Sequence, residues 1–390
     1  MLRSQRRVPF DMSTPAQNPE KPRILFVDGI RCLAILPVVL YHYYSRWTPP
    51  SHEVNLYPYG GRFSQFFSSG YYGVHLFFIV SGFVITLTLH KCDSIREFAV
   101  RRLARLWPTM ALCSTLTYLA LTILPNRLFN SSPAYFVPSL TFTDPDLLNG
   151  VFGTRSLDWI DGAYWSLFVE VRFYILAAAI YFVQKNQFAR NMLWLGSTIS
   201  LGYALVVSRG LPGVFQLELF CVAKYLPWFL VGISFYYIHS GLEEKRRKRM
   251  MALAIIALLL QPLAHGYRPN KFHMAIPILL PLLFYVASRW TPLNRLLSSR
   301  VMVAIGASSY SLYLLHQNAG VSLIDYIAST LRLHGSPSAV IPLLVAIAFG
   351  LLALMIHRLW ESPLNALIVK RLNRSKARAM GASVAPAAKP

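Results

Sequence analysis

The chain has 390 residues, of which 55% are hydrophobic and only 14% are charged, whereas soluble proteins carry about a quarter charged residues. This composition excludes a soluble globular protein and indicates an integral membrane protein. The net charge of +22 could suggest nucleic-acid binding, but the basic residues lie in short segments between or after apolar runs. We therefore expect no nucleic-acid partner and attribute the charge to membrane topology and to contact with membrane lipid.

The apolar residues form uninterrupted runs, such as SAVIPLLVAIAFGLLALMI near the C-terminus. Only helices and closed barrels can span a bilayer, and the alternation typical of barrel strands is missing from these runs. The sequence therefore predicts an all-α, polytopic transmembrane bundle of about ten spans. The predicted spans are 30–44 (with polar residues from Asp28 inward), 71–89, 107–124, 163–183, 192–207, 219–238, 250–264, 272–288, 303–323 and 339–359.

The connecting segments of this bundle alternate in charge. Most Lys and Arg residues lie in one set of segments, which holds both tails and the loops around Arg102, Arg190, Arg247 and Arg295. Because cytoplasmic loops are enriched in Lys and Arg, both termini are predicted to be cytoplasmic. The predicted organisation is a basic N-terminal tail over 1–23, a transmembrane domain over 24–361 and a basic C-terminal tail over 362–390.

The first span carries three ionisable residues that lipid should exclude, namely Asp28, Arg31 and His42. Such residues usually face a polar cavity. Arg31 and His42 are eleven positions apart, which places them on nearly the same helix face, separated by roughly 16 Å along the axis. Histidine is suited to accept a proton near neutral pH. The alternative is a packed histidine that bonds to a neighbouring helix, and the spacing leaves both interpretations open.

Arg102 and Arg105 lie in FAVRRLARLWP, and at i and i+3 of a helix they are neighbours. Two guanidinium groups fixed in this way can bind phosphate. The alternative is that they are ordinary cytoplasmic anchors of the third span. The motif alone does not decide between the two.

Further polar residues occur inside predicted spans. Glu170 lies in YWSLFVEVRFYIL, and because Arg172 is only two positions away, the two side chains should point to opposite faces. In the ninth span, Ser309, Tyr313 and His316 fall on one face at i, i+4 and i+7. This polar face can be a contact between helices or the wall of a cavity.

Two long segments on the predicted outer side, 46–70 and 125–162, suit a site that receives a ligand from that side, although they can equally be connectors. The second holds four acidic residues, which leaves a membrane glycosyltransferase or polymerase as a minor alternative: Asp144, Asp146, Asp158 and Asp161. The four cysteines are scattered and have no His companions at metal-ligand spacing, so we predict no metal site.

Six fragments in chain order resemble the successive signatures of the membrane acyltransferase family 3. They are RILFVDGIRCLAILPVVLYH, LFFIVSGFVI, FAVRRLARLWP, YWSLFVEVRFYIL, GASSYSLYLLHQ and LWESP, and together they extend over nearly the whole chain. The resemblance implies a fold of about ten transmembrane helices. It also implies transfer of an acyl group, usually acetyl, from cytoplasmic acyl-coenzyme A to a hydroxyl, typically on a sugar.

The resemblance also implies roles for individual residues. An Arg followed by ten residues and a His matches Arg31 and His42, and the family's RxxR motif matches Arg102 and Arg105. Other recurrent positions fall on Glu170, on Ser81 with Gly82, and on Tyr310 with His316. The expected catalytic residues are His42, Glu170 and Arg31. Arg102, Arg105 and Arg31 are expected to bind the acyl-coenzyme A, and the expected substrate or oxyanion contacts are Asp28, Ser81, Tyr310 and His316.

The expected protein is therefore an O-acyltransferase of the bacterial inner membrane, with His42 as general base and acetyl-coenzyme A as the co-substrate. An envelope or secreted glycan, or a glycolipid, is the expected acceptor. One alternative is acyl transfer to a small glycoside or macrolide-type acceptor. A secondary transporter or glycan flippase is the alternative from another class, since polar residues within spans also suit transport. The sequence leaves the oligomeric state open.

Overall fold

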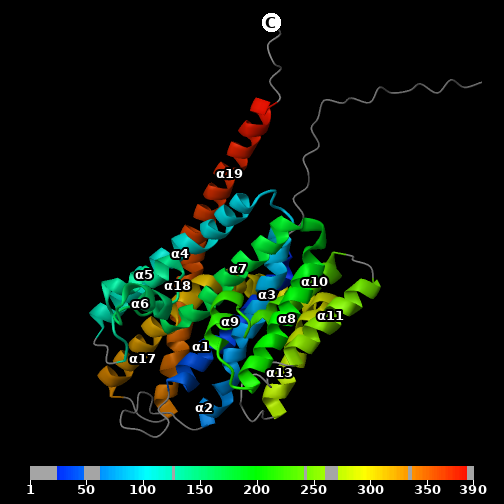
Figure 1. Cartoon of the computed structure of the whole chain (residues 1–390). Helices are drawn as coiled ribbons and strands as arrows, with labels where there is room; N and C mark the ends of the chain where they lie inside the picture. Colours follow the sequence, from blue (N-terminus) through cyan, green and yellow to red (C-terminus); the bar gives the residue numbers. More distant parts are fainter. Residues whose placement is uncertain are drawn as a thin grey trace, which may run out of the picture.

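The computed structural model describes residues 24–47, 62–124, 128–240, 244–259, 271–332 and 336–383. The predicted N-terminal tail over 1–23 lies outside these residues, as do parts of the two long outer segments. Within the described residues the chain is all-helical, as predicted (Figure 1). The helices are α1 (Leu25–Tyr41), α2 (Arg62–Phe67), α3 (Gly73–Leu89), α4 (Ile95–Ile123), α5 (Phe136–Thr141), α6 (Pro145–Phe152), α7 (Trp165–Val183), α8 (Phe188–Ser208), α9 (Val214–Cys221), α10 (Leu226–His239), α11 (Glu244–Leu259), α13 (Lys271–Arg289), α14 (Thr291–Leu297), α15 (Arg300–Ala307), α16 (Ser309–Leu315), α17 (Asn318–Leu331), α18 (Val340–Ile356) and α19 (Ser362–Ser383).

Seven stretches of the described residues are long and apolar enough to cross a membrane, and they agree with seven of the predicted spans. They are Leu25–Arg46, Ser64–Leu89, Ile95–Ile123, Gly162–Val183, Lys185–Ser208, Val214–His239 and Val340–Lys376. An eighth span is formed if α13 and α14, which meet at a bend of 95°, count as one. The predicted span 250–264 runs past the end of α11 into residues outside the described part. The count of about ten and the cytoplasmic termini therefore stay predictions.

The predicted span 303–323 is not one continuous helix. It is divided into α15, α16 and α17, with breaks at Ser308 and at His316–Gln317. Polar residues at these breaks supply side-chain hydrogen bonds where the helix geometry is interrupted. The prediction rested on the average hydrophobicity of the segment, and this average does not change where a helix is interrupted. The segment was therefore predicted as a single span.

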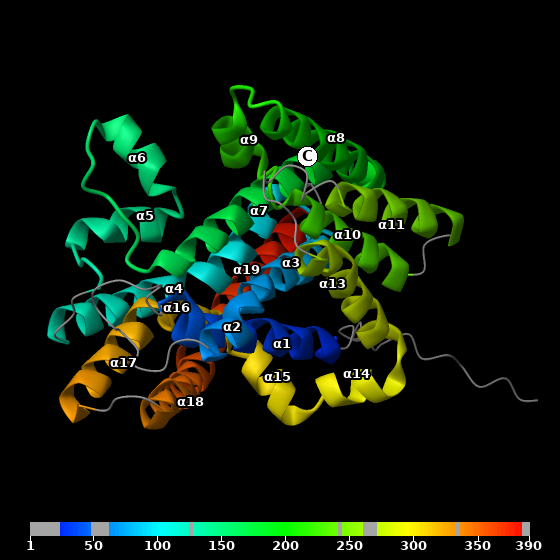
Figure 2. The same ribbon diagram turned by 90° about the horizontal axis from the view of Figure 1, so that it is seen from below.

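Helix α3 lies at the centre of the bundle, where it packs against α1, α7 and α10 (Figure 2). Two glycines permit its close approach to α10. A Cβ atom at Gly82 would collide with the carbonyl of Phe229, and one at Gly232 would collide with the carbonyl of Ile79. Helices in lipid associate through such tight van der Waals packing, because lipid chains remove the hydrophobic drive between them.

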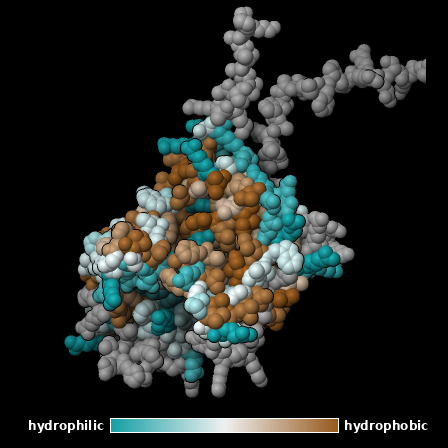
Figure 3. Space-filling view, viewed as in Figure 1, coloured by the Kyte–Doolittle hydropathy of each residue, from teal (hydrophilic) through white to brown (hydrophobic). Residues whose placement is uncertain are grey.

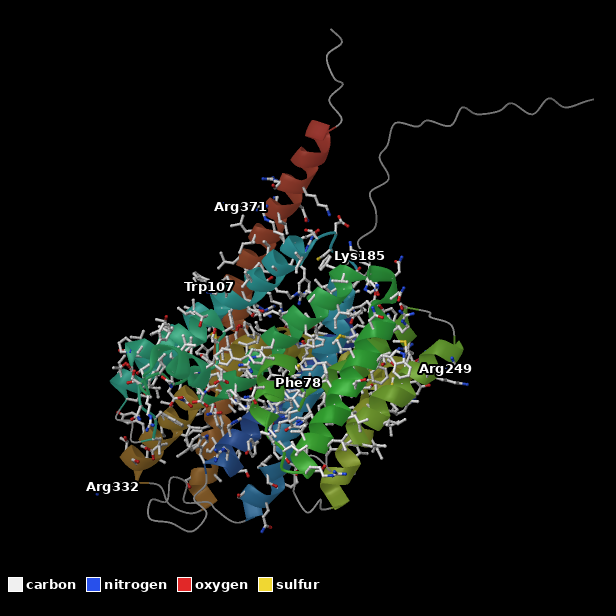
Figure 4. The ribbon with its side chains drawn as sticks, in the orientation of Figure 1. Phe78, Trp107, Lys185, Arg249, Arg332 and Arg371 are labelled. Carbon is white, nitrogen blue, oxygen red and sulfur yellow. The ribbon has the colours of Figure 1, made fainter. Side chains whose placement is uncertain are left out.

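One end of the bundle gathers basic side chains, and we call it the basic end. Helices α3, α7 and α10 finish there and α4 begins there: the Lys185 ammonium donates to the Asp93 carbonyl, and the Tyr237 hydroxyl lies 3.3 Å from Nε2 of His90. Lys185 and Arg371 lie at this end in Figure 4, and Arg332 lies at the other. The first turn of α3 packs against the last turns of α1, so α1 runs opposite to α3 and begins at the basic end.

The segment expected to be a basic C-terminal tail forms helix α19 up to Ser383. It follows α18 through a π-helical turn and packs along α4. Lys376 pairs with Asp93 and Glu97, and Arg101 donates to Asn373. These contacts hold helix α19 against the start of α4, the helix that also carries Arg102 and Arg105.

The face shown in Figure 3 has hydrophobic residues over its middle and hydrophilic residues along its upper margin. Many large apolar side chains of the outer helices are exposed, including Ile175 at 66%, Val183 at 80% and Leu351 at 64%. A soluble protein rarely exposes apolar patches of this extent. The surface therefore agrees with an integral membrane protein.

Candidate active site

A cavity lies between α1, α3, α4, α7 and α16. Phe78, which lines it from α3, is labelled in the middle of the bundle in Figure 4. Its lining combines apolar side chains with most of the residues that the sequence singled out. The polar lining residues are Arg31, Ser81, Arg102, Arg105, Ser166, Glu170, Tyr174, Ser309, Tyr310 and Tyr313.

Three arginines give the cavity a positive charge. Arg102 and Arg105 enter from α4 and Arg31 from α1, while Glu170 is the one acid among the lining residues. The Arg102 guanidinium donates to the Thr88 hydroxyl and lies 5.9 Å from the centre of the Tyr174 ring. Its Nε is buried and has no hydrogen-bond partner among the described residues. A donor left over in this way, inside a cavity with excess positive charge, is suited to an anionic ligand.

Asp28 does not line the cavity but supports it. Its carboxylate lies 3.7 Å from the Arg31 guanidinium, one turn away on α1, and its side chain is buried. Its backbone lies against Gly306 of α15 so closely that a Cβ atom there would collide with the Asp28 carbonyl. Asp28 is therefore placed to hold Arg31 in position, whereas the sequence suggested a substrate or oxyanion contact.

Glu170 is held by two hydroxyl groups. Ser81 of α3 and Tyr174, one turn along α7, both donate to its Oε1, the second at 2.5 Å. Arg172 points elsewhere, and its guanidinium lies 3.5 Å from the Asp144 carboxylate. This confirms that Glu170 and Arg172 lie on different faces. The half-buried Glu170 carboxylate thus has the partners that a charge inside a membrane span needs, and it lines the same cavity as the arginines.

His42 and His316 form a direct pair at the other end of α1. His42 begins a π-helical turn, a feature frequent at functional sites. Its Nδ1 lies 3.1 Å from Nε2 of His316 and 2.9 Å from the Val38 carbonyl. Nδ1 of His316 lies 2.8 Å from the Tyr313 carbonyl. The two histidines come from helices 274 residues apart in the chain.

These contacts select one tautomer for each neutral ring. A carbonyl oxygen only accepts, so Nδ1 of His316 carries its proton and Nε2 has the lone pair. Nδ1 of His42 likewise carries the proton that it shares between Val38 and His316. The lone pair of His42 is thereby placed on Nε2, which makes no hydrogen bond to any described residue. A base with its lone pair fixed and unused can accept a proton.

Tyr313 lies between the histidine pair and the cavity. Its ring lines the cavity and lies 5.4 Å from the His316 ring, measured between centres. Its hydroxyl donates to the Ala163 carbonyl at 2.7 Å and accepts from Ser166 at 2.6 Å. The cavity thus extends from Arg31 to Tyr313, and the described residues that line it do not include His42 or His316. Arg31 and His42 therefore stand at the two ends of α1 with Tyr313 between the cavity and the pair.

The buried carboxylate of Asp161 stabilises the turn that follows His316. One oxygen of Asp161 accepts the Ala163 N–H at 2.8 Å, and the other accepts the Asn318 N–H, also at 2.8 Å. The Asn318 amide in turn donates to the Ile160 carbonyl at 3.0 Å. Asp161 therefore joins the start of α7 to the break between α16 and α17, which fixes the position of His316.

The other outer acidic residues have local roles too. Asp144 caps α6 and pairs with Arg172, and Asp158 accepts the N–H of Trp159. The part of the chain that the structure describes contains no group of three His, Cys, Asp or Glu residues that could hold a metal ion. Asp144 and Asp158, like Asp161, therefore have partners in the surrounding structure.

The remaining candidates, Ser81, Tyr310 and Ser309, differ in whether their hydroxyl groups already have a hydrogen-bond partner. Tyr310 lines the cavity, but its hydroxyl donates to the Leu106 carbonyl at 2.9 Å, and the Ser81 hydroxyl donates to Glu170. Ser309 also lines the cavity, and its hydroxyl is buried without a hydrogen-bond partner in the described part of the chain. Ser309 is therefore better placed than Ser81 or Tyr310 to donate to a ligand.

Sequence reasoning missed the local partners of the site. Tyr174 was detectable, because it lies at i+4 from Glu170 on the same helix. Ser166, Asp161 and the buried Glu361, which accepts from Ser311 at 3.0 Å, make contacts that depend on distant segments. Ser166 and Glu361 lie in the fragments YWSLFVEVRFYIL and LWESP, but no short-range pattern in the sequence indicates the contacts that they make.

Comparison with known proteins decides the family. Residues 24–357 match the profile of the acyltransferase 3 family, described as an acyltransferase domain. The chain belongs to this family. The resemblance found in the six sequence fragments is thereby confirmed over most of the chain.

Curated relatives of this acyltransferase 3 protein include proteins of Staphylococcus aureus. The O-acetyltransferase OatA of strain NCTC 8325 / PS 47 is 24% identical over 374 residues, which cover 87% of this chain and 57% of OatA. A provisionally named O-acetyltransferase of strain COL, SACOL0978, is 22% identical over 329 residues, covering 74% of this chain and 49% of the relative. The chain thus spans about half the length of the curated relatives it matches. No solved structure matches it.

Proposed function

We propose that the chain transfers an acyl group, acetyl in the first place, from acyl-coenzyme A to a hydroxyl of a glycan. The observation that carries the proposal is one arrangement: a cavity with three arginines at one end of α1 and a paired histidine at the other. Membership of the acyltransferase 3 family supports the reaction class. Relatives named O-acetyltransferase support acetyl as the group and a bacterial membrane as the location.

The cavity residues fit the chemistry of the proposed donor. Coenzyme A carries several phosphate charges, which match the excess of guanidinium groups around Arg102. The pantetheine arm is slender and partly apolar, and the cavity wall formed by Phe77, Val80 and Val84 suits it. In this arrangement the donor enters at the basic end and its thioester reaches toward Tyr313.

His42 is the proposed general base. The acceptor oxygen attacks the thioester carbonyl carbon while Nε2 of His42 removes the hydroxyl proton. The carbon–sulfur bond then breaks, and the proton passes from the imidazolium to the departing thiolate, so that coenzyme A leaves as the thiol. Because no Ser or Cys side chain among the described residues bonds to either histidine, we propose direct transfer rather than an acyl-enzyme. Ser309 is the proposed donor to the developing oxyanion.

The acceptor is proposed to enter from the end opposite to the basic end, where His42 lies. A sugar hydroxyl on an envelope glycan or glycolipid is the first proposal, and a small glycoside is the second. The test is the release of coenzyme A by membranes that contain the protein. Release that depends on an added glycan acceptor supports the proposal, and a rate that is independent of every acceptor tested contradicts it.

The Glu170→Gln variant tests the charge of Glu170 apart from its hydrogen bonds. Both donors bond to Oε1, an acceptor that glutamine retains, so Ser81 and Tyr174 keep their partner and the fold should persist. We expect turnover to fall about tenfold, because a negative charge among three guanidinium groups is lost. Steady-state kinetics measures this, with the amount of inserted protein as the control. Unchanged turnover would show that the carboxylate is only a packing element.

The His316→Leu variant tests whether His316 positions His42. Without the Nε2 acceptor, the His42 ring loses a contact that fixes its tautomer, and we expect turnover to fall about ten- to a hundredfold. The KM for acetyl-coenzyme A should not change, because the arginines are untouched. The His316→Gln variant retains an acceptor and should recover part of the rate. Equal rates in both variants would remove the positioning role.

A secondary transporter or flippase is the second candidate. The breaks in the predicted span 303–323 favour it, because transporters often build their sites at broken helices. Flux of a glycan through proteoliposomes without any acyl donor would support transport. Acceptor-dependent release of coenzyme A without such flux would support the transferase.

A further inference from the structure

A second cavity lies on the other side of α3 from the candidate active site. It is enclosed by α1, α3, α10 and α13, and it shares no lining residue with the first cavity. Its lining residues are Phe26, Phe83, Phe235, Ile238, His239, Phe284, Ser288 and Arg289. Neither the predicted sites nor the proposed reaction uses any of them.

The interior of this second cavity is aromatic. The Phe284 ring is at its centre, stacked on Phe235 at 4.6 Å between ring centres and approached by Phe83 at 5.8 Å and Phe26 at 6.0 Å. All four rings are buried and come from four different helices. A surface of this kind binds hydrocarbon and offers nothing to a small hydrophilic ion.

The mouth of the second cavity is cationic. His239 and Arg289 are the last residues of α10 and α13, and both are exposed. Arg289 forms no ion pair with any acid in the described part of the chain. The carbonyl ends of the two helices repel an anion, so an anionic group here must be held by the side chains. The guanidinium supplies the donors for it.

The surroundings place this mouth at a membrane interface. The outer face of α13 exposes Ile278 at 54%, Leu282 at 50% and Tyr285 at 47%, which in a bilayer contact lipid chains. Trp290, next to Arg289, is 58% exposed. Tryptophan gathers at the level of the lipid headgroups. Because α10 finishes at the basic end, the mouth lies at that end of the bundle.

We propose that the second cavity binds an anionic phospholipid. An acyl chain lies along the exposed apolar face of α13 and reaches the aromatic lining of the cavity, and the phosphate is bound by Arg289, with His239 beside it. Two features together favour this ligand. The apolar interior suits a hydrocarbon chain, and the guanidinium of Arg289, which has no ion-pair partner among the described residues, suits a negatively charged headgroup. A free phosphate would satisfy the second feature alone, and a neutral lipid the first alone. The proposal does not depend on acyl transfer.

Native mass spectrometry of the full chain released from detergent micelles tests this proposal. The probes are phosphatidylglycerol, diacylglycerol with the same chains and no phosphate, and inorganic phosphate. We expect phosphatidylglycerol to bind about tenfold more tightly than diacylglycerol, the effect of one charge-assisted hydrogen bond. The Arg289→Ala variant should abolish this preference. The Arg295→Ala variant should keep it, since Arg295 is exposed on α14 and does not line the cavity.

A second variant tests the interior. Ser288→Trp at the mouth should obstruct the cavity and weaken binding of both lipids while the arginine remains. The same preference for phosphatidylglycerol in the wild type and in Arg289→Ala would overturn the proposal. Loss of the preference in Arg295→Ala as well would overturn it too, because it would indicate general attraction to basic surface. Displacement of the lipid by inorganic phosphate at equal concentration would overturn it in favour of a phosphate site.

Discussion

Replacing His42 by alanine is expected to lower the rate of acyl transfer by at least about a hundredfold, the usual contribution of a general base. The lone pair on Nε2 is fixed by the contacts of Nδ1 with Val38 and His316, and alanine removes it. Coenzyme A release in membranes that contain an acceptor measures the effect. The binding of acetyl-coenzyme A should persist, because the arginines remain.

The control for this variant is a histidine outside the pair whose Nδ1 also lies 2.9 Å from a carbonyl one helical turn earlier. His90 at the end of α3 contacts the Thr86 carbonyl and Tyr237 and does not line the first cavity. The His90→Ala variant should keep the full rate. A His42→Ala protein that is inserted normally and transfers acyl groups at the wild-type rate would remove the base assignment.

The second large effect is expected from the double variant Arg102→Ala with Arg105→Ala. Each guanidinium can form charge-assisted hydrogen bonds to a phosphate, which contribute about 1.5–3 kcal/mol each. Losing both should weaken the binding of acetyl-coenzyme A by about a hundredfold or more. The remaining binding should also depend less on salt, because fewer charges take part. Isothermal titration of the detergent-solubilised protein at two salt concentrations measures both quantities.

A matched control removes two other positive charges at the same end. Lys91 and Arg96 are exposed and do not line the cavity. Their double alanine variant changes the net charge equally and should leave the affinity unchanged. Equal losses in the two double variants would show that Arg102 and Arg105 act only as part of a general positive field.

Much of the fold could be predicted because lipid imposes a simple rule on the sequence. A spanning helix requires a long apolar run, and seven of the predicted spans agree with helices that meet this requirement. The rule fails where an apolar run is long enough to span the membrane but the helix that it forms is broken. His316 and Gln317 lie inside an apolar run, yet the helix ends there because Asp161, far away in the chain, binds the N–H of Asn318.

The candidate site was predictable to the extent that its residues lie on one helix face or stand out by charge. Arg31, Arg102, Arg105 and Glu170 are ionisable residues in apolar surroundings, and all four line one cavity. The pairing of His42 with His316 was not predictable from spacing, because it joins two helices whose relative placement depends on the whole bundle. The position of Tyr313 between the cavity and the pair has the same origin.

The pairing also changes the chemical account. A lone histidine in a membrane helix has two nitrogens that can each carry the proton, and only a second contact decides which one is the base. Here the Tyr313 carbonyl sets the tautomer of His316, and His316 with Val38 sets that of His42. The π-helical turn at His42–Arg46 displaces the residues after α1 from regular helix geometry, where a plain α-helix would continue.

The central claim is that acetyl groups from acetyl-coenzyme A reach an acceptor hydroxyl through His42. The most direct measurement is mass spectrometry of the surface glycans and secreted glycosides of three otherwise identical strains, producing the wild type, the His42→Ala variant or no protein. We predict a species heavier by one acetyl group only in the wild-type strain, lost on mild alkaline treatment that cleaves esters. Identical spectra from all three strains, with both proteins inserted at equal levels, would contradict the account.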